Sequence, residues 1–245
     1  MRTVRLVIAF QGTRYEGWQS QRSGKTLQEI FERHLAKILK EKATLISSSR
    51  TDSGVHAQGM VAHFRTKSNL PDAKLRDALN FYLPEDVLVR SAKTVPASFH
   101  ARYGAKHKIY EYLIWNSRTR PAYNLAPFCL WHVSRLDPTK MRKAAKYVLG
   151  KHDFSAFRDS GDDERNPART IHSILIHKNG PKISIKFRGN GFLRHMVRVL
   201  VGTLIEVGRG KLPISQIQHI LASKDRKKAG PTAKPHGLTL LKVSY

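Results

Sequence analysis

The chain has 245 residues, enough to bury one sizeable hydrophobic core or two small cores joined closely. Its 44 lysines and arginines against 18 aspartates and glutamates give a formal charge of +26. A role of this charge in binding nucleic acid is favoured over a role in solubility alone. The single cysteine, Cys129, excludes an intrachain disulfide, and no apolar run is long enough to cross a bilayer, so we expect a cytoplasmic protein without membrane contact.

The first half of the sequence predicts the order strand, helix, strand, strand, helix, strand. Met1–Phe10 alternates polar and apolar residues, which is typical of a strand and not of a signal peptide. Thr26 and Glu29 form a capping box ahead of a helical apolar stripe. The later predicted elements are a strand near 43–48, a turn at Ser49–Gly54, a strand at Met60–Phe64, a helix from Pro71 to just before Pro84, and an extended segment at Val87–Val95.

The second half predicts a similar order of elements. Asn179 and Gly180 between two apolar runs are a strong signal for a β-hairpin. Asp137 and Pro138 predict the start of a helix that stops at Gly150. The remaining predicted elements are strands at Lys106–Trp115, Thr170–His177, Lys182–Arg188 and Leu238–Tyr245, and helices at Phe192–Val207 and after Pro213.

Together these elements predict an α+β fold with two halves of similar size, residues 1–105 and 106–245. Each half would have a mainly antiparallel sheet covered by helices on one face, with a catalytic cleft between the halves. The two halves share no sequence repeat, so any relation between them would be structural only.

Familiar cofactor motifs are missing from the sequence. It has no Gly-rich phosphate loop, no dinucleotide fingerprint and no Cys-x-x-Cys pair. The twelve histidines show no tight metal-ligand spacing. A reaction that needs neither a nucleotide cofactor nor a metal is therefore the simpler prediction.

The densest polar cluster of the chain is Ser48–His56, which lies between two predicted strands. It contains Asp52, Arg50, His56 and several hydroxyl groups. An aspartate on a turn often only caps its own backbone. An aspartate held ionised by nearby cations is equally a poised nucleophile, and spacing alone does not decide between the two interpretations.

Two further segments carry candidate site residues. The alternation in Ile109–Ile114 places Tyr110 and Tyr112 on one face of a strand, where each would be either a core residue or a ring that stacks on a base. Arg194 and Arg198 are four residues apart in a predicted helix and would share a face. Arg198 has apolar neighbours and needs an anionic partner, which would be an aspartate of the other half or part of a structural ion pair.

Five segments, in order along the chain, resemble signatures of the TruA-type tRNA pseudouridine synthases. The most specific is Arg50-Thr-Asp-Ser-Gly-Val-His56, which is similar to the catalytic motif of that family. The other four are Phe10–Gln21, Tyr110–Asn116, Gly150–Phe157 and Phe192–Gly202.

This resemblance implies an isomerase that converts uridine to pseudouridine at positions 38, 39 and/or 40 in the anticodon stem-loop of tRNA. It implies that Asp52 is the nucleophile and that Arg198 pairs with it and keeps it ionised. Tyr110 would stack on the flipped target base, and Arg50 and His56 would contact the RNA. The family is homodimeric and needs no cofactor or metal, so tRNA and a second copy are the expected partners.

The sequence departs from the usual motif at two positions, where Ser49 and Ser53 replace glycine and alanine. Ser49 would be strained if that position needed a positive φ. Three other interpretations compete with the main one. They are the same chemistry on another structured RNA, a metal-free ribonuclease that uses His56, and an RNA-binding protein without catalysis.

Overall fold

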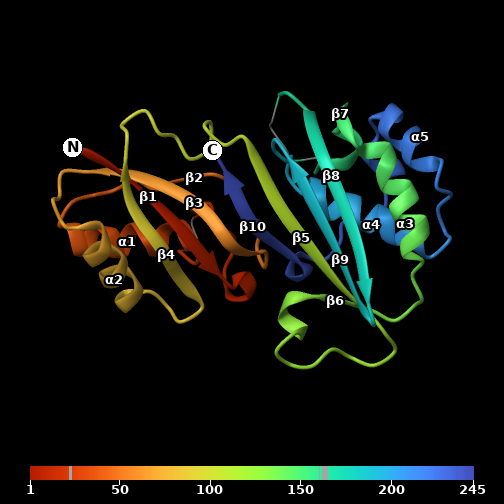
Figure 1. Cartoon of the computed structure of the whole chain (residues 1–245), viewed down its shortest axis with the longest axis horizontal. Coiled ribbons are helices and arrows are strands. Elements are labelled where there is room, and N and C mark those ends of the chain that lie inside the picture. Colours follow the sequence, from red (N-terminus) through yellow and green to blue (C-terminus); the bar gives the residue numbers. More distant parts are fainter. Residues whose placement is uncertain (22–23, 160, 162–164) are drawn as a thin grey trace. The chain divides into compact units, whose positions relative to one another are not determined.

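The computed structural model describes residues 1–21, 24–159, 161 and 165–245, which form two compact units (Figure 1). Unit 1 comprises Met1–Lys106 and the terminal segment Leu240–Tyr245. Unit 2 comprises His107–Thr239. The chain therefore completes unit 2 before its last residues return to unit 1.

Unit 1 is built on a sheet with the strand order β4-β1-β3-β10. Its central strand β1 is antiparallel to β3 and to β4. The apolar side chains that alternate along β1 are buried, as predicted, because they face the core of the unit. The strands of this sheet are β1 (Arg2–Phe10), β2 (Ile46–Ser47, paired with β3), β3 (His56–Thr66), β4 (Val87–Val95) and β10 (Leu238–Ser244).

Two helices lie side by side against this sheet (Figure 1): α1 (Leu27–Leu39) and α2 (Asp72–Tyr82). The capping box predicted at the start of α1 is confirmed, since Thr26 and Glu29 bond reciprocally. The apolar stripe of α1 is buried. Burial of this stripe joins the helix layer to the sheet and gives unit 1 its own core.

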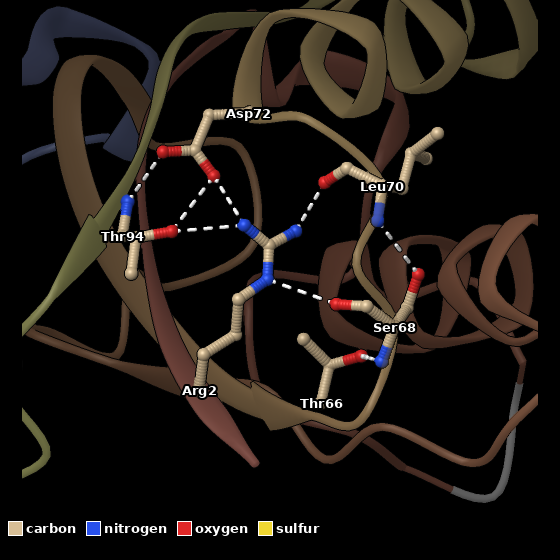
Figure 2. A network of polar contacts seen from close by, with 6 residues as sticks. All are labelled: Arg2, Thr66, Ser68, Leu70, Asp72 and Thr94. Carbon is tan, nitrogen blue, oxygen red and sulfur yellow. Dashed lines mark hydrogen bonds and ion pairs between the residues drawn. The ribbon is translucent and has the colours of Figure 1, made fainter.

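A polar network joins the start of α2 to the first residue of β1 and to Thr94 near the end of β4 (Figure 2). The Arg2 guanidinium donates to the Asp72 carboxylate at 2.8 Å and to the Thr94 hydroxyl at 2.9 Å. It also donates to the carbonyl oxygens of Ser68 and Leu70. Asp72 is the first residue of α2, where the helix dipole favours a carboxylate.

Within unit 2 the strands follow the order β5-β9-β8-β7. The hairpin predicted at Asn179-Gly180 is confirmed, because it joins the antiparallel strands β8 and β9, with Gly180 at φ +55°. The short strand β6 pairs in parallel with β5. The strands are β5 (His107–Asn116), β6 (Leu130–His132), β7 (Gly150–Asp153), β8 (Ala168–Asn179) and β9 (Lys182–Gly189).

The helices of unit 2 are α3 (Pro138–Ala145), α4 (Met196–Gly208) and α5 (Gln216–Ser223), and α3 packs on both α4 and β8 (Figure 1). Asp137 caps α3 as predicted, by accepting two backbone N–H groups. The prediction that the last long helix begins at Phe192 was wrong. His195 adopts a left-handed backbone with φ +59°, so the helix begins only at Met196.

The predicted α+β class, with mainly antiparallel strands, is confirmed by these strands and helices. None of the helices in the described part of the chain has the length and apolar character that crossing a membrane requires. Short 3-10 turns complete the fold at Gly12–Arg14, Ala126–Phe128, Lys146–Val148, Ser155–Phe157, Arg226–Lys228 and Pro235–Gly237.

Candidate active-site residues

Asp52 begins a tight turn directly before β3. The N–H of Val55 donates to the Asp52 carbonyl oxygen at 3.1 Å. Gly54 has φ +78°, the left-handed backbone that the third position of a type II turn requires. Asp52 is half-buried and Arg50 is exposed. A turn is thus present where one was predicted, and it leaves part of Asp52 open to solvent.

The two serines that depart from the family motif fit this loop without backbone strain. Among the described non-glycine residues, positive φ values occur only at Lys40, His195 and Lys224, so the strain considered for Ser49 does not arise. The Ser53 hydroxyl donates to the carbonyl oxygen of Tyr15 at 3.1 Å. Ser53 therefore adds a hydrogen bond that an alanine would not make.

An earlier segment, Gly12–Trp18, lies against the Asp52 loop. The N–H of Trp18 donates to the Thr51 carbonyl oxygen at 3.0 Å. The N–H of Gly12 donates to Nδ1 of His56, also at 3.0 Å, and His56 is only 2% exposed. The sequence patterns assigned no site role to this segment, and its glycines, Gly12 and Gly17, do not by themselves indicate which residues they pack against.

Asp86 binds two side chains of this segment, Arg14 and Tyr15. Its carboxylate accepts from the Tyr15 hydroxyl at 2.5 Å and from Arg14 at 2.9 Å. Burial and the hydrogen bond to Asp86 raise the pKa of Tyr15 well above its ordinary value. The Tyr15 phenol therefore stays protonated and donates to Asp86 throughout the neutral range.

In unit 2, Tyr110 and Tyr112 occupy one face of β5, as predicted. Tyr110 is 7% exposed, and its ring meets Phe192 edge-on with 5.4 Å between centroids. Tyr112 is fully buried and donates its hydroxyl to the Lys234 carbonyl oxygen at 2.8 Å. Burial raises the pKa of Tyr112, although the positive charge of Arg198 opposes the rise.

Arg198 lies in the first turn of α4, and both its backbone and its side chain form hydrogen bonds with Ala233. Its Nε donates to the Ala233 carbonyl oxygen at 2.8 Å, while the N–H of Ala233 donates to the Arg198 carbonyl oxygen at 3.1 Å. Arg194 precedes the helix and its Nε lies 3.3 Å from the Asp159 carboxylate. The prediction that these two arginines share a helical face was therefore wrong, because the helix begins after Arg194.

Comparison with known proteins decides the family. The model of the tRNA pseudouridine synthase family matches residues 6–104 and 144–245. The chain belongs to the tRNA pseudouridine synthase family. Proteins called tRNA pseudouridine synthase A from Thermoanaerobacter sp. (strain X514) and from Acetivibrio thermocellus are each 46% identical to it, over the full length of both chains. The family predicted from the motifs is confirmed, and with it the predicted enzyme class, an isomerase.

Among solved structures, this tRNA pseudouridine synthase matches a chain of a Cbf5–Nop10–Gar1 complex with a TM-score of 0.41 and 11% identity. The match covers 97% of this chain and 48% of that chain. This chain therefore spans about half the length of the matched protein.

The candidate site residues of this synthase are divided between the two units. Arg50 and Asp52 belong to the loop before β3 and His56 is the first residue of β3, all in unit 1, whereas Tyr110 and Arg198 belong to unit 2. The pairing of Asp52 with Arg198 therefore involves one residue from each unit, and it stays a prediction. Within the described ranges, no three histidine, cysteine, aspartate or glutamate side chains gather in a way that would hold a metal ion.

Proposed function

We propose that this chain converts uridine to pseudouridine at positions 38, 39 and/or 40 of the tRNA anticodon stem-loop. The observation that carries the proposal is the unbroken Arg-Thr-Asp-x-Gly-Val-His string at residues 50–56, in a chain that aligns over its full length with proteins called tRNA pseudouridine synthase A. The charge of +26 supports a phosphate-rich substrate. The family resemblance further suggests a homodimer that works in the cytoplasm.

Asp52 is the proposed nucleophile. A uridine must first leave the base stack, because its glycosidic bond is out of reach inside a helix. The carboxylate then attacks the flipped nucleotide, the bond between N1 and C1′ breaks, and a bond between C5 and C1′ replaces it. The hydrogen on C5 leaves for solvent and N1 gains a proton, so the reaction needs no redox partner.

The other assigned residues serve this step in different ways. Arg198 is the proposed basic partner that keeps Asp52 ionised. Tyr110 is the proposed stacking ring for the detached uracil, and since it is only 7% exposed, the base must reach it inside a site rather than on an open surface. Arg50 is exposed and is proposed to contact the RNA.

Three alternatives predict different products. The same chemistry on another structured RNA would leave tRNA unmodified, a ribonuclease would leave fragments, and a binder without catalysis would leave RNA intact and unchanged. The burial of His56 weakens the ribonuclease alternative, because an acid–base group must reach the bond that it cleaves.

The target positions are tested with three tRNA transcripts, each carrying uridine at only one of positions 38, 39 and 40. After incubation with the protein, pseudouridine is mapped by carbodiimide modification and primer extension. We expect a new stop at one or more of these positions and none at other uridines. Modification only elsewhere in the tRNA, or only in other structured RNAs, would contradict the assigned target.

A further inference from the structure

Residues on both sides of Asp52 form hydrogen bonds with one other segment of unit 1, Gly12–Trp18. Before Asp52, the Thr51 carbonyl oxygen accepts from the Trp18 N–H at 3.0 Å. After it, the Ser53 hydroxyl donates to the Tyr15 carbonyl oxygen at 3.1 Å. Four residues after Asp52, Nδ1 of His56 accepts from the Gly12 N–H at 3.0 Å. The position of the Asp52 turn thus depends on the position of this segment against the loop.

The contact at Gly12 leaves no space for a side chain. A Cβ atom added at Gly12 would lie 2.0 Å from the Val55 carbonyl oxygen, so the two backbones touch directly. The hydrogen bond to His56 is buried. A buried N–H that loses its acceptor cannot turn to water instead, so the segment would have to move to recover a partner.

The acceptor in this bond is a ring nitrogen of His56, and the bond therefore determines whether that nitrogen carries a proton. Nδ1 accepts only through its lone pair, so it carries no proton while Gly12 donates to it. Only 2% of His56 is exposed, and this ring is therefore poorly placed to contact a substrate. Its geometry suits a role in supporting the loop.

We propose that His56 is a positioning residue. By accepting the Gly12 N–H, it holds Gly12–Trp18 against the loop and so determines the position of the Asp52 carboxylate. This inference rests on the proposed function, in which Asp52 attacks the target nucleotide. Catalysis by an oriented nucleophile is sensitive to displacements of about 1 Å, which cost on the order of 100-fold in rate. Loss of the His56 acceptor should therefore lower the rate of the chemical step more than the binding of RNA.

The test compares two buried histidines of the same strand. His63 is 5% exposed, and its Nδ1 accepts a backbone N–H from Ala101, which is remote in sequence from the Asp52 loop. We would measure the single-turnover rate constant and the tRNA Kd for His56→Leu, His56→Asn and His63→Leu. His56→Asn keeps an acceptor atom near the place of Nδ1.

We expect His56→Leu to lower the rate constant by about 10- to 100-fold with little change in Kd. His56→Asn should restore most of the rate, and His63→Leu should keep it even if its melting temperature falls. A wild-type rate in His56→Leu would overturn the inference. Equal losses of rate in His56→Leu and His63→Leu would also overturn it, because they would indicate a general effect of core disruption.

Two further measurements separate a failure of the His56 role from misfolding of a variant and from a failure of the proposed function. In wild-type protein labelled with 15N at its 16 glycines, the Gly12 amide should exchange slowly with solvent, and rapid exchange would overturn the inference even if His56→Leu does not fold. Asp52→Ala is measured beside these variants. If Asp52→Ala stays active, the proposed function fails, whereas an inactive Asp52→Ala with a fully active His56→Leu removes only the role of His56.

Discussion

Among single residues, two buried tyrosines, Tyr15 and Tyr112, and the half-buried Tyr245 make the chain sensitive to alkaline pH. Burial raises the pKa of Tyr15, Tyr112 and Tyr245 above the ordinary value. For Tyr15, the hydrogen bond to Asp86 adds to this effect. An acid whose pKa is raised on folding stabilises the fold below the pKa of the unfolded chain, about 10 for a tyrosine, and this stabilisation is lost as the pH rises further.

We therefore predict that the free energy of unfolding falls above about pH 10 as these phenols ionise. Urea unfolding at several pH values between 8 and 11, followed by fluorescence, measures the fall. Tyr112→Phe has no phenol to ionise at this position and should lose less stability over the same range. A wild-type curve no steeper than that of Tyr112→Phe would show that Tyr112 does not contribute.

The predictability of the site also differs from residue to residue. Local spacing was sufficient to place Asp52 on a turn, because Gly54 supplies the positive φ that such a turn requires. The hydrogen bond between the Gly12 N–H and His56 was not predictable, since the two residues are 44 positions apart and no pattern along the chain links them. The sequence motif thus predicts candidate site residues, and the contacts that hold their loop in place appear only in the tertiary structure.

Elements of secondary structure were predicted well where a local signal starts or ends them. The capping box of α1 and the Asn-Gly hairpin are such signals, and both are confirmed. The start of α4 was placed too early, because the apolar run continues through Phe192 and Leu193 while His195 adopts φ +59°. The strands β6 and β7 were not predicted, since segments of three and four residues carry too little pattern.

At the element scale, the network around Arg2 makes a testable contribution to stability. Arg2 joins β1 to the start of α2 and to Thr94 of β4. Although partial burial opposes ionisation of Asp72, hydrogen bonds from Thr94 and Arg2 hold its pKa below the usual value. The group is therefore charged at neutral pH and the ion pair is intact.

We predict that Arg2→Ala lowers the free energy of unfolding by about 1–2 kcal/mol, because several acceptors lose their donor together. Arg76→Ala is the matched control, since its ion pair with Asp77 is exposed, and it should change stability by less than about 1 kcal/mol. Urea unfolding measures both variants. Equal effects would mean that the network acts only as an ordinary surface pair.

For the whole molecule, charge and division into two units are the features that bear on function. A charge of +26 on 245 residues destabilises a compact fold unless a polyanion offsets the repulsion, and tRNA is such a polyanion. The proposed nucleophile lies in unit 1, and its proposed partners Tyr110 and Arg198 lie in unit 2. Activity is therefore expected to require both units.

The most direct test of the account follows the hydrogen at C5 of the target uridine. tRNA transcripts labelled with tritium at C5 of uridine are incubated with the wild-type protein and with Asp52→Asn, which keeps the size of the side chain and removes its charge. We predict that wild-type protein releases tritium from full-length tRNA, and that Asp52→Asn binds the tRNA and releases none. Comparable release by Asp52→Asn, or RNA cut by the wild-type protein, would contradict the account.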